Sequence, residues 1–117
     1  MVHFLPFRAI RPKKEYAAGI SSLPYDVISE DEARQTLKKN ELSFVKVIRS
    51  EVDLPEGTDP YSSQVYDRAR DNLDAYIRDG FMLRDKSDCY YIYREIYNGK
   101  AQTGIAGVIP VHDYEDM

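Results

Sequence analysis

Residues 21–29 read Ser-Ser-Leu-Pro-Tyr-Asp-Val-Ile-Ser and lead into a segment that we expect to be helical over residues 30–40. Pro24 restricts its own backbone and favours an extended conformation for the residue before it. Ser29 and Glu32 have the spacing of a capping box, in which the serine hydroxyl and the glutamate carboxylate each accept a backbone N–H of the other residue. The sequence therefore predicts a stiffened loop that ends at a helix N-terminus.

This loop is the first candidate site. Free N–H groups and the helix dipole favour anions at a helix N-terminus, so the side chains of Ser21, Ser22, Tyr25 and Ser29 are candidate substrate- or phosphate-binding groups. Asp26 lies three residues before the cap, where a carboxylate suits Mg²⁺ binding or proton acceptance. The alternative interpretation is an ordinary turn in which Asp26 bonds nearby backbone N–H groups, and this is the commoner use of an aspartate.

The composition is that of an ordinary globular protein. Hydrophobic residues make up 43% of the 117 residues and charged residues 31%, and the length predicts a single domain over residues 1–117. The net charge of −4 provides no drive for nonspecific nucleic-acid binding. The basic cluster of Arg8, Arg11, Lys13 and Lys14 can meet phosphates or form a solvated surface, and the second interpretation is the more common.

Several classes of protein are disfavoured by what the sequence lacks. A single cysteine, Cys89, excludes an internal disulfide, and His3 and His112 have no metal-ligand spacing, so we expect no metal site built from such clusters. No run approaches the roughly 20 apolar residues of a membrane span. The first residues also lack the features of a signal peptide. We therefore expect no membrane association and a cytoplasmic location.

Three segments have strand patterns. Residues 4–10 mix aromatic and β-branched residues around Pro6 and predict an edge strand, because proline cannot donate to a ladder. Residues 43–49 are rich in β-branched residues and predict a central strand. Residues 81–84 predict a short strand.

A long amphipathic helix is the clearest helical signal. Asp59 and Pro60 form a strong helix start, apolar residues then recur every four positions, and Gly80 follows as a left-handed stop.

The acidic loop before this helix holds Asp53 and Glu56. Their proximity suggests a cation site, but solvated loop acids are the commoner interpretation.

Residues 89–108 predict a β-hairpin that turns at Asn98-Gly99, which pairs Tyr97 with Lys100. One face is expected to join the core, and it carries Tyr90, Ile92, Ile96, Ala101 and Ile105. The opposite face carries Tyr91, Tyr93, Glu95, Tyr97, Lys100 and Gln102. Its three tyrosines either stack against a base or ring of a ligand, or are covered by a helix or by chain that is missing from this sequence.

Together these elements predict an α+β fold, with a small mixed or antiparallel sheet, a C-terminal Asn-Gly hairpin and two helices on one side of the sheet. Gly104 and Gly107 in the return strand indicate bulges or close backbone approach.

The chain resembles the domain-of-unknown-function 1015 family along essentially its whole length. The residues that carry the resemblance are 4–12, 24–29 with Glu32-Ala33, 42–44, 52–55, 58–61 and Gln102-Thr103-Gly104. Members of that family resemble chains several times longer, which continue beyond the equivalent of Asp113-Tyr114-Glu115 into a motif containing His-Glu-His-Thr. The resemblance therefore implies that this chain is an N-terminal fragment.

That family is grouped with ParB-like and sulfiredoxin-like domains, which bind nucleotides through their phosphates and include the free serine kinase. The grouping implies a ParB- or sulfiredoxin-like fold and a loop at residues 11–15 that follows the first strand. Glu15 is then a candidate catalytic base, Asp26 a metal or substrate ligand and Arg11 a phosphate-binding residue.

Two functions from different classes stay open. One is part of a nucleotide-dependent phosphotransferase or phosphate-handling enzyme, which would use ATP or ADP with Mg²⁺ and a small-molecule substrate. The other is a noncatalytic nucleotide-binding or protein-interaction domain, in which residues 24–26 are structural or contact a partner. Phosphoryl transfer needs phosphate ligands, a cation and a base, and this sequence offers candidate bases without a glycine-rich phosphate cradle.

Overall fold

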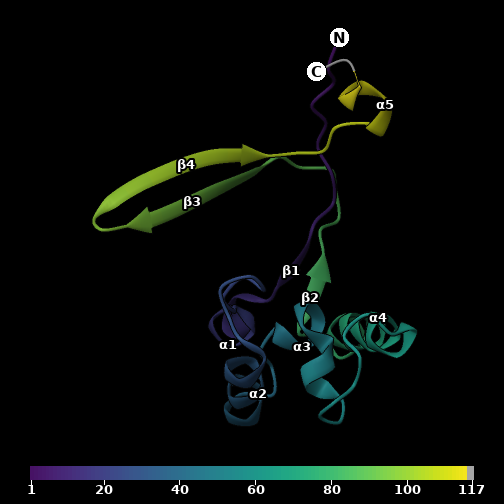
Figure 1. Cartoon of the computed structure of the whole chain (residues 1–117). Helices are drawn as coiled ribbons and strands as arrows, with labels where there is room; N and C mark the ends of the chain where they lie inside the picture. The colour runs from purple at the N-terminus through teal and green to yellow at the C-terminus, as the bar shows by residue number, and fades with distance from the viewer. Residues whose placement is uncertain (116–117) are drawn as a thin grey trace. The chain divides into compact units, whose positions relative to one another are not determined.

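A computed structural model describes residues 1–115 and shows a mixed α+β protein (Figure 1). The chain forms two compact units. One comprises residues 12–83, and the other comprises residues 1–11 together with the chain from Arg84 onward. Each unit is described by itself below. The single-domain organisation stays a prediction.

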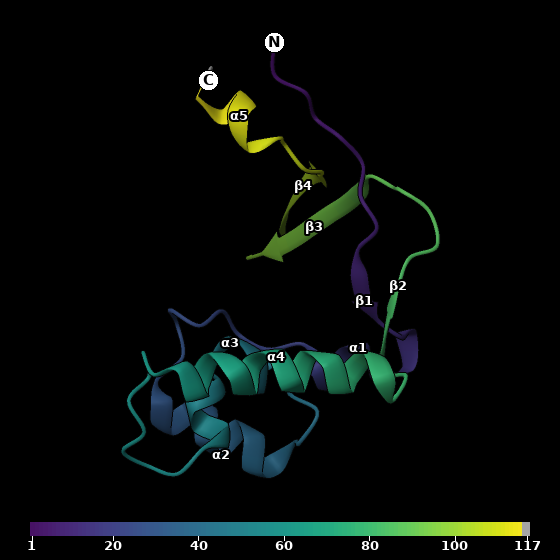
Figure 2. The ribbon, with the colours of Figure 1, turned by 90° about the vertical axis from the view of Figure 1, so that its right-hand side faces the viewer.

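The unit of residues 12–83 is mainly helical. The long helix α4 contacts α3 and η2, and α2 contacts the same two elements (Figure 2). The bounds of its helices are η1 (Lys14–Tyr16), α1 (Ala17–Ile20), α2 (Glu30–Lys39), α3 (Val45–Ile48), η2 (Ser50–Asp53) and α4 (Ser63–Arg78). Strand β1 (Ile10–Pro12) pairs with β2 (Met82–Arg84), and the division between the units runs through these two strands.

The core of this unit lies where α2, α3 and η2 meet. Ile28, Ala33, Val45 and Val52 are buried together, and Leu37 packs against them. Ala33 and Leu37 lie four positions apart and share one helix face, as the sequence indicates. This buried cluster holds the short elements in place around the longer α2.

The predicted central strand at residues 43–49 is wrong, because this segment forms the helix α3. Val45 is fully buried there, and its N–H faces the Ser43 hydroxyl at 3.4 Å. The backbone N–H of Phe44 donates to the carbonyl of Ile20 at 2.8 Å. β-Branched residues favour strands only where a pleated neighbour is present, and here burial against helices decides the conformation.

The two longer helices end largely as predicted. Helix α2 runs from Glu30 to Lys39 with Asn40 as its C-cap, and α4 stops before Gly80, whose φ of +80° is left-handed. The start of α4 differs from the prediction. Its N-cap is Ser62, and Asp59 instead accepts the backbone N–H of Tyr61 at 2.9 Å in a separate turn.

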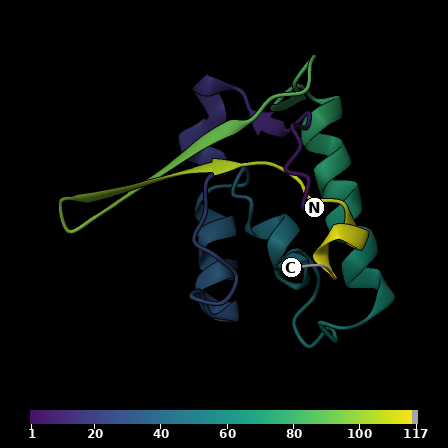
Figure 3. The ribbon, with the colours of Figure 1, turned by 90° about the horizontal axis from the view of Figure 1, so that it is seen from above.

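The second unit contains the hairpin of β3 (Tyr91–Tyr97) and β4 (Lys100–Ala106) and the short helix α5 (Val111–Tyr114). The predicted turn and register are confirmed. Asn98 and Gly99 both have positive φ, and Tyr97 pairs with Lys100. Figure 3 shows the two strands of this antiparallel hairpin side by side. The predicted edge strand at residues 4–10 is reduced to two isolated bridges, which join Leu5 to Val108 and Phe7 to Cys89.

The expected core face of the hairpin is wrong, because within residues 1–115 neither face is buried. Ile92, Ile96 and Ile105 are 78%, 65% and 67% exposed, and Tyr90 and Ala101 are exposed as well. On the opposite face Tyr93 and Tyr97 are 65% and 76% exposed. The register confirms the predicted alternation of side chains, but alternation does not reveal whether another layer covers the sheet.

Candidate functional site

The predicted capping box is present at the end of the candidate loop. The Ser29 hydroxyl accepts the backbone N–H of Glu32 at 3.1 Å and donates to the Glu32 carboxylate at 2.9 Å. The loop before it is a turn in which the N–H of Val27 donates to the carbonyl of Pro24 at 3.1 Å. Asp26 and Tyr25 are exposed on this turn. The Asp26 carboxylate makes no hydrogen bond within residues 1–115, so the turn does not depend on it.

Ser21 and Ser22 lie at an apolar depression rather than at a phosphate cradle. The Ser21 hydroxyl donates to the carbonyl of Ala17 at 2.7 Å, which ends α1. Both serines line a cavity of about 350 Å³. Its other lining residues are Pro12, Ile20, Leu23, Pro24, Phe44, Ile48 and Met82. This surface suits apolar contact better than anion binding.

Glu15 is exposed on η1, and no ion pair or hydrogen bond of the described chain joins it to Asp26. Arg11 belongs to the other unit, where its guanidinium lies 3.1 Å from Asp85 and 5.3 Å from the centre of the Tyr91 ring. The hydrogen bond from Tyr91 and the neighbouring Arg11 lower the pKa of Asp85. These three residues, with Lys86, Ser87 and Cys89, contribute to the lining of a cavity of about 470 Å³.

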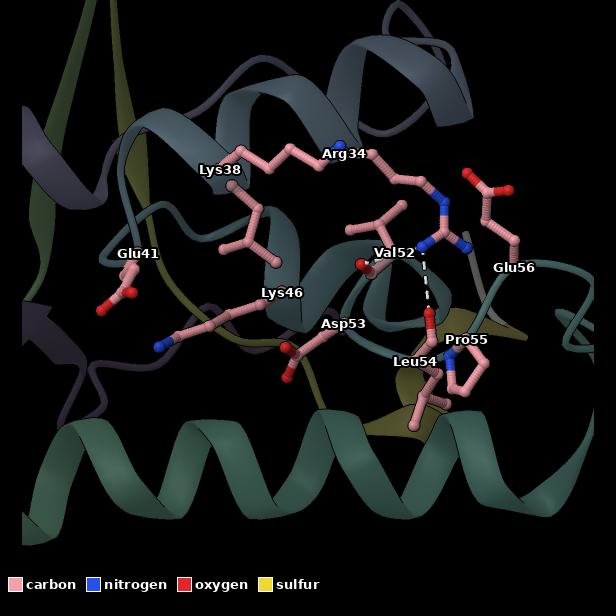
Figure 4. Close-up of a pocket in the computed structure, with 10 residues that line it drawn as sticks. Arg34, Lys38, Glu41, Lys46, Val52, Asp53, Leu54, Pro55 and Glu56 are labelled. Carbon is pink, nitrogen blue, oxygen red and sulfur yellow. Dashed lines mark hydrogen bonds between the residues drawn. The ribbon is translucent and has the colours of Figure 1, made fainter.

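A larger cavity of about 580 Å³ lies in the helical unit (Figure 4). We call it the α2–η2 pocket. It is lined by Arg34, Leu37, Lys38, Glu41, Lys46, Val52, Asp53, Leu54, Pro55 and Glu56. The residues come from α2 and the turn after it, from α3, and from η2 and the loop after it.

Arg34 builds one wall of the α2–η2 pocket. Its guanidinium donates to the carbonyl of Leu54 at 2.9 Å (Figure 4). It also donates to the carbonyls of Glu51 and Val52 at 3.2 and 3.3 Å, and to the Glu30 carboxylate at 3.0 Å. The side chain is largely buried. A planar fork of donors suits several fixed acceptors, so Arg34 holds η2 and the following loop against α2.

Two lysines give the α2–η2 pocket its available positive charge. Neither Lys38 nor Lys46 makes an ion pair in the part of the chain that the structure describes. The Lys46 ammonium lies 4.8 Å from the centre of the Tyr76 ring. Among the acids of the pocket, Asp53 accepts the Asn72 amide at 3.0 Å. The pocket therefore offers two ammonium groups for an anion and several carboxylates for a cation.

Sequence reasoning missed this pocket for an identifiable reason. Arg34 and Lys38 both fall in the segment predicted to be helical, but nothing local shows which partner this helix meets. Lys46 falls in residues 43–49, for which the sequence wrongly predicts a strand. The sequence indicates Asp53 and Glu56 as a pair of acids, and the structure places both in the pocket lining. No group of three or more His, Cys, Asp or Glu side chains in residues 1–115 is placed to hold a metal ion.

The fold and this site define an α+β protein with a charged, solvent-open pocket on its helical unit. The chain belongs to the family described as protein of unknown function (DUF1015), whose sequence profile matches residues 4–117. This confirms the family resemblance, whereas the relation to ParB-like and sulfiredoxin-like domains stays a prediction. Searches among curated proteins and among solved structures found no match.

None of the helices in the described residues is both long and apolar enough to cross a lipid bilayer. The cytoplasmic location stays a prediction.

Proposed function

We propose that this domain binds a small phosphate-bearing molecule, a nucleotide being the leading candidate, in the α2–η2 pocket, as the binding part of a phosphate-handling enzyme. The observation that supports this most directly is that Lys38 and Lys46 line one pocket and that neither makes an ion pair within residues 1–115. Charge-assisted hydrogen bonds to phosphate are roughly twice as strong as neutral ones, so two available ammonium groups favour such a ligand.

The residues of the pocket have separate roles in this proposal. Lys38 and Lys46 contact the phosphate oxygens. Arg34 acts as a positioning residue, because its donors are already used on backbone carbonyls. The carboxylates of Asp53 and Glu56 are oxygen ligands of the type that Mg²⁺ uses together with substrate phosphates. In a complex of a nucleotide with Mg²⁺, the two lysines would therefore match the negative charge of the phosphates, and the two carboxylates would match the positive charge of the metal ion.

The predicted catalytic residues are not among the residues that line this pocket. Glu15 and Asp26 are exposed carboxylates of the same unit, and neither lines the α2–η2 pocket. Phosphoryl transfer requires a base in addition to phosphate ligands. Use of Asp26 or Glu15 as that base remains part of the proposal, and it is separable from binding.

The test is thermal unfolding of the protein with ATP, ADP or CTP, each with Mg²⁺. A ligand at about 100 times its Kd stabilises the folded state by about 2.7 kcal/mol, so binding raises the Tm. We expect Lys38→Gln and Lys46→Gln to abolish the shift. Lys39→Gln is the matched control, because Lys39 is the neighbouring exposed lysine of α2 and does not line the pocket.

The same measurement separates the two candidate sites. A shift that is lost in Asp26→Ala or Glu15→Ala but kept in Lys38→Gln would move the site to the predicted loop. The absence of a shift with all three nucleotides would contradict the proposal. Turnover of a small-molecule substrate by the nucleotide-bound protein would then distinguish an enzyme from a binding domain.

A noncatalytic protein-interaction domain is the second candidate. It is favoured by a different observation, the exposure of apolar side chains on both faces of the β3–β4 hairpin. A protein that binds none of the nucleotides but associates through this hairpin would support it.

A further inference from the structure

The cavity of about 470 Å³ in the second unit has a charged side and an aromatic side. We call it the Arg11 pocket. Arg11, Asp85 and Lys86 form its charged side, and Tyr90 and Tyr91 form its aromatic side. Every residue that lines it belongs to this one unit, and its volume is typical of small-molecule sites, which measure about 300–1,000 Å³.

The guanidinium of Arg11 is held in one orientation by two contacts. One of its nitrogens donates to the Asp85 carboxylate at 3.1 Å, and its central carbon lies 5.3 Å from the centre of the Tyr91 ring. Asp85 is fixed in turn, because its second carboxylate oxygen accepts the Tyr91 hydroxyl and its backbone N–H donates to the carbonyl of Ala9 at 2.9 Å. Arg11 is therefore oriented before a ligand binds, which lowers the entropic cost of binding.

Most donors of this oriented guanidinium are available to a ligand. The Arg11 side chain is 60% exposed, and its other N–H groups make no hydrogen bond within residues 1–115. Lys86 is exposed and makes no ion pair in the same part of the chain. The charged side thus carries two cations against one carboxylate, and both oxygens of that carboxylate are already engaged. This excess of positive charge favours an anionic ligand.

The aromatic side provides a fixed apolar surface. The Tyr90 ring stacks on Phe4 with the ring centres 5.5 Å apart, and its hydroxyl donates to the carbonyl of Phe4 at 2.8 Å. Tyr90 is nevertheless 51% exposed, so a second ring can pack against it. Aromatic pairs attract each other beyond the effect of burying their area.

We propose that the Arg11 pocket binds a small aromatic carboxylate. The carboxylate meets the Arg11 guanidinium through two parallel hydrogen bonds, a geometry that the planar fork of an arginine matches and an ammonium group does not. Lys86 adds a second, flexible positive charge, and the ring of the ligand packs beside Tyr90. This site lies in a different unit from the α2–η2 pocket, and the inference does not depend on the function proposed there.

Amide chemical shifts in two-dimensional NMR of the whole chain test the proposal. Benzoate is the probe, benzamide is its neutral counterpart, and inorganic phosphate is an anion without a ring. We expect benzoate to shift the amide signals of residues 85–92, and we expect benzamide and phosphate to have Kd values at least tenfold higher. Equal affinity for benzamide overturns the proposal, because the charge of the ligand then plays no part. Equal affinity for phosphate overturns it as well, because the aromatic side then contributes nothing.

Substitution of arginine by lysine tests the role of the planar fork. Arg11→Lys keeps the positive charge but removes the paired donors, so the Kd for benzoate should rise at least tenfold. Arg94→Lys is the matched control and should leave the Kd within twofold, because Arg94 is an exposed arginine of the same unit that does not line the pocket. Lys86→Gln leaves the contact between Arg11 and Asp85 intact and should raise the Kd severalfold.

The amide spectrum of each variant also reports whether the variant is folded like the unsubstituted protein. The absence of shifts with benzoate overturns the proposal, as do shifts confined to residues 12–83. A folded Arg11→Lys variant with an unchanged Kd overturns it too. If that variant does not fold, an unchanged Kd in Lys86→Gln is the overturning result.

Discussion

Asp113 of α5 holds His3, which lies 110 positions earlier in the chain, through two contacts to one carboxylate oxygen. The backbone N–H of His3 donates to Oδ2 at 3.0 Å, and Nδ1 of the imidazole lies 2.8 Å from the same atom. The other oxygen, Oδ1, lies 3.1 Å from Nε2 of His112. Asp113 is buried, so this carboxylate fastens the start of the chain to α5.

This contact predicts a pH-dependent contribution to stability. The hydrogen bonds from His3 lower the pKa of Asp113, so the folded state prefers the carboxylate form. The stabilisation is fully present above the ordinary carboxyl pKa of about 3.9 and is lost as the pH falls through the lower folded value. Asp113→Asn should therefore unfold at lower urea concentration at neutral pH, and the difference from the unsubstituted protein should shrink in acid.

The exposed Asp88→Asn is the control for that experiment, since Asp88 makes no ion pair within the described residues. A difference between Asp113→Asn and the unsubstituted protein that stays constant from neutral to acid pH would show that the carboxylate charge is not involved.

Two glycines of the second unit predict opposite effects of the same substitution. A Cβ at Gly107 would lie 2.7 Å from the Phe4 ring and 2.8 Å from the carbonyl of Leu5, whereas a Cβ at Gly104 would meet nothing within 4 Å. Gly107→Ala should therefore destabilise the protein by about 1–3 kcal/mol, as overpacking does. Gly104→Ala should be neutral or slightly stabilising. Thermal unfolding of the two variants decides this, and equal Tm values would contradict it.

Two serines at helix N-caps also predict opposite outcomes. The Ser29 hydroxyl caps α2 through the N–H of Glu32, so Ser29→Ala should cost about 0.5–2 kcal/mol. The Ser62 hydroxyl at the start of α4 makes no cap hydrogen bond and is buried without a partner among the described residues. Ser62→Ala removes a desolvated hydroxyl and should be neutral or stabilising. Urea denaturation measures both, and a loss of similar size at Ser62 would mean that its hydroxyl has a partner.

The elements that the sequence predicts well are those set by local chemistry. Asn98-Gly99 determines the hairpin register, because only residues that tolerate positive φ form that turn. Ser29 and Gly80 mark helix ends through their own hydrogen bonds or backbone conformation. The sequence predicts bulges or close backbone approach at Gly104 and Gly107. The neighbouring Leu5 carbonyl confirms close approach at Gly107, whereas nothing lies within 4 Å of a Cβ at Gly104.

The elements that the sequence mispredicts depend on partners far along the chain. The segment around Val45 has strand-forming residues but is helical, because Ile20 and Tyr76 supply its neighbours. The α2–η2 pocket escaped detection for the same reason, since Arg34 meets its carbonyl acceptors 17 to 20 residues later in the chain. Periodicity shows that Ile92 and Ile105 share a face, but it carries no information about what covers that face.

Tyr76 connects the stability of the helical unit with the proposed binding pocket. It is only 2% exposed, and its hydroxyl lies 2.6 Å from the carbonyl of Leu42 and 3.0 Å from that of Ser43. Burial raises the pKa of Tyr76 far above its usual value, so the hydroxyl remains a donor at all ordinary pH values. Tyr76→Phe leaves these acceptors without their donor and should cost about 1–3 kcal/mol in the free energy of unfolding.

The same substitution keeps the aromatic ring beside which the Lys46 ammonium lies. Tyr76→Phe should therefore lower the urea midpoint while a nucleotide that binds the α2–η2 pocket still raises the Tm by the same amount. Tyr66→Phe, on the exposed side of the same helix, should change neither quantity. A Tyr76→Phe variant of unchanged stability would show that the hydroxyl contributes nothing. A variant that loses the nucleotide shift would show that the hydroxyl, and not the ring alone, positions Lys46.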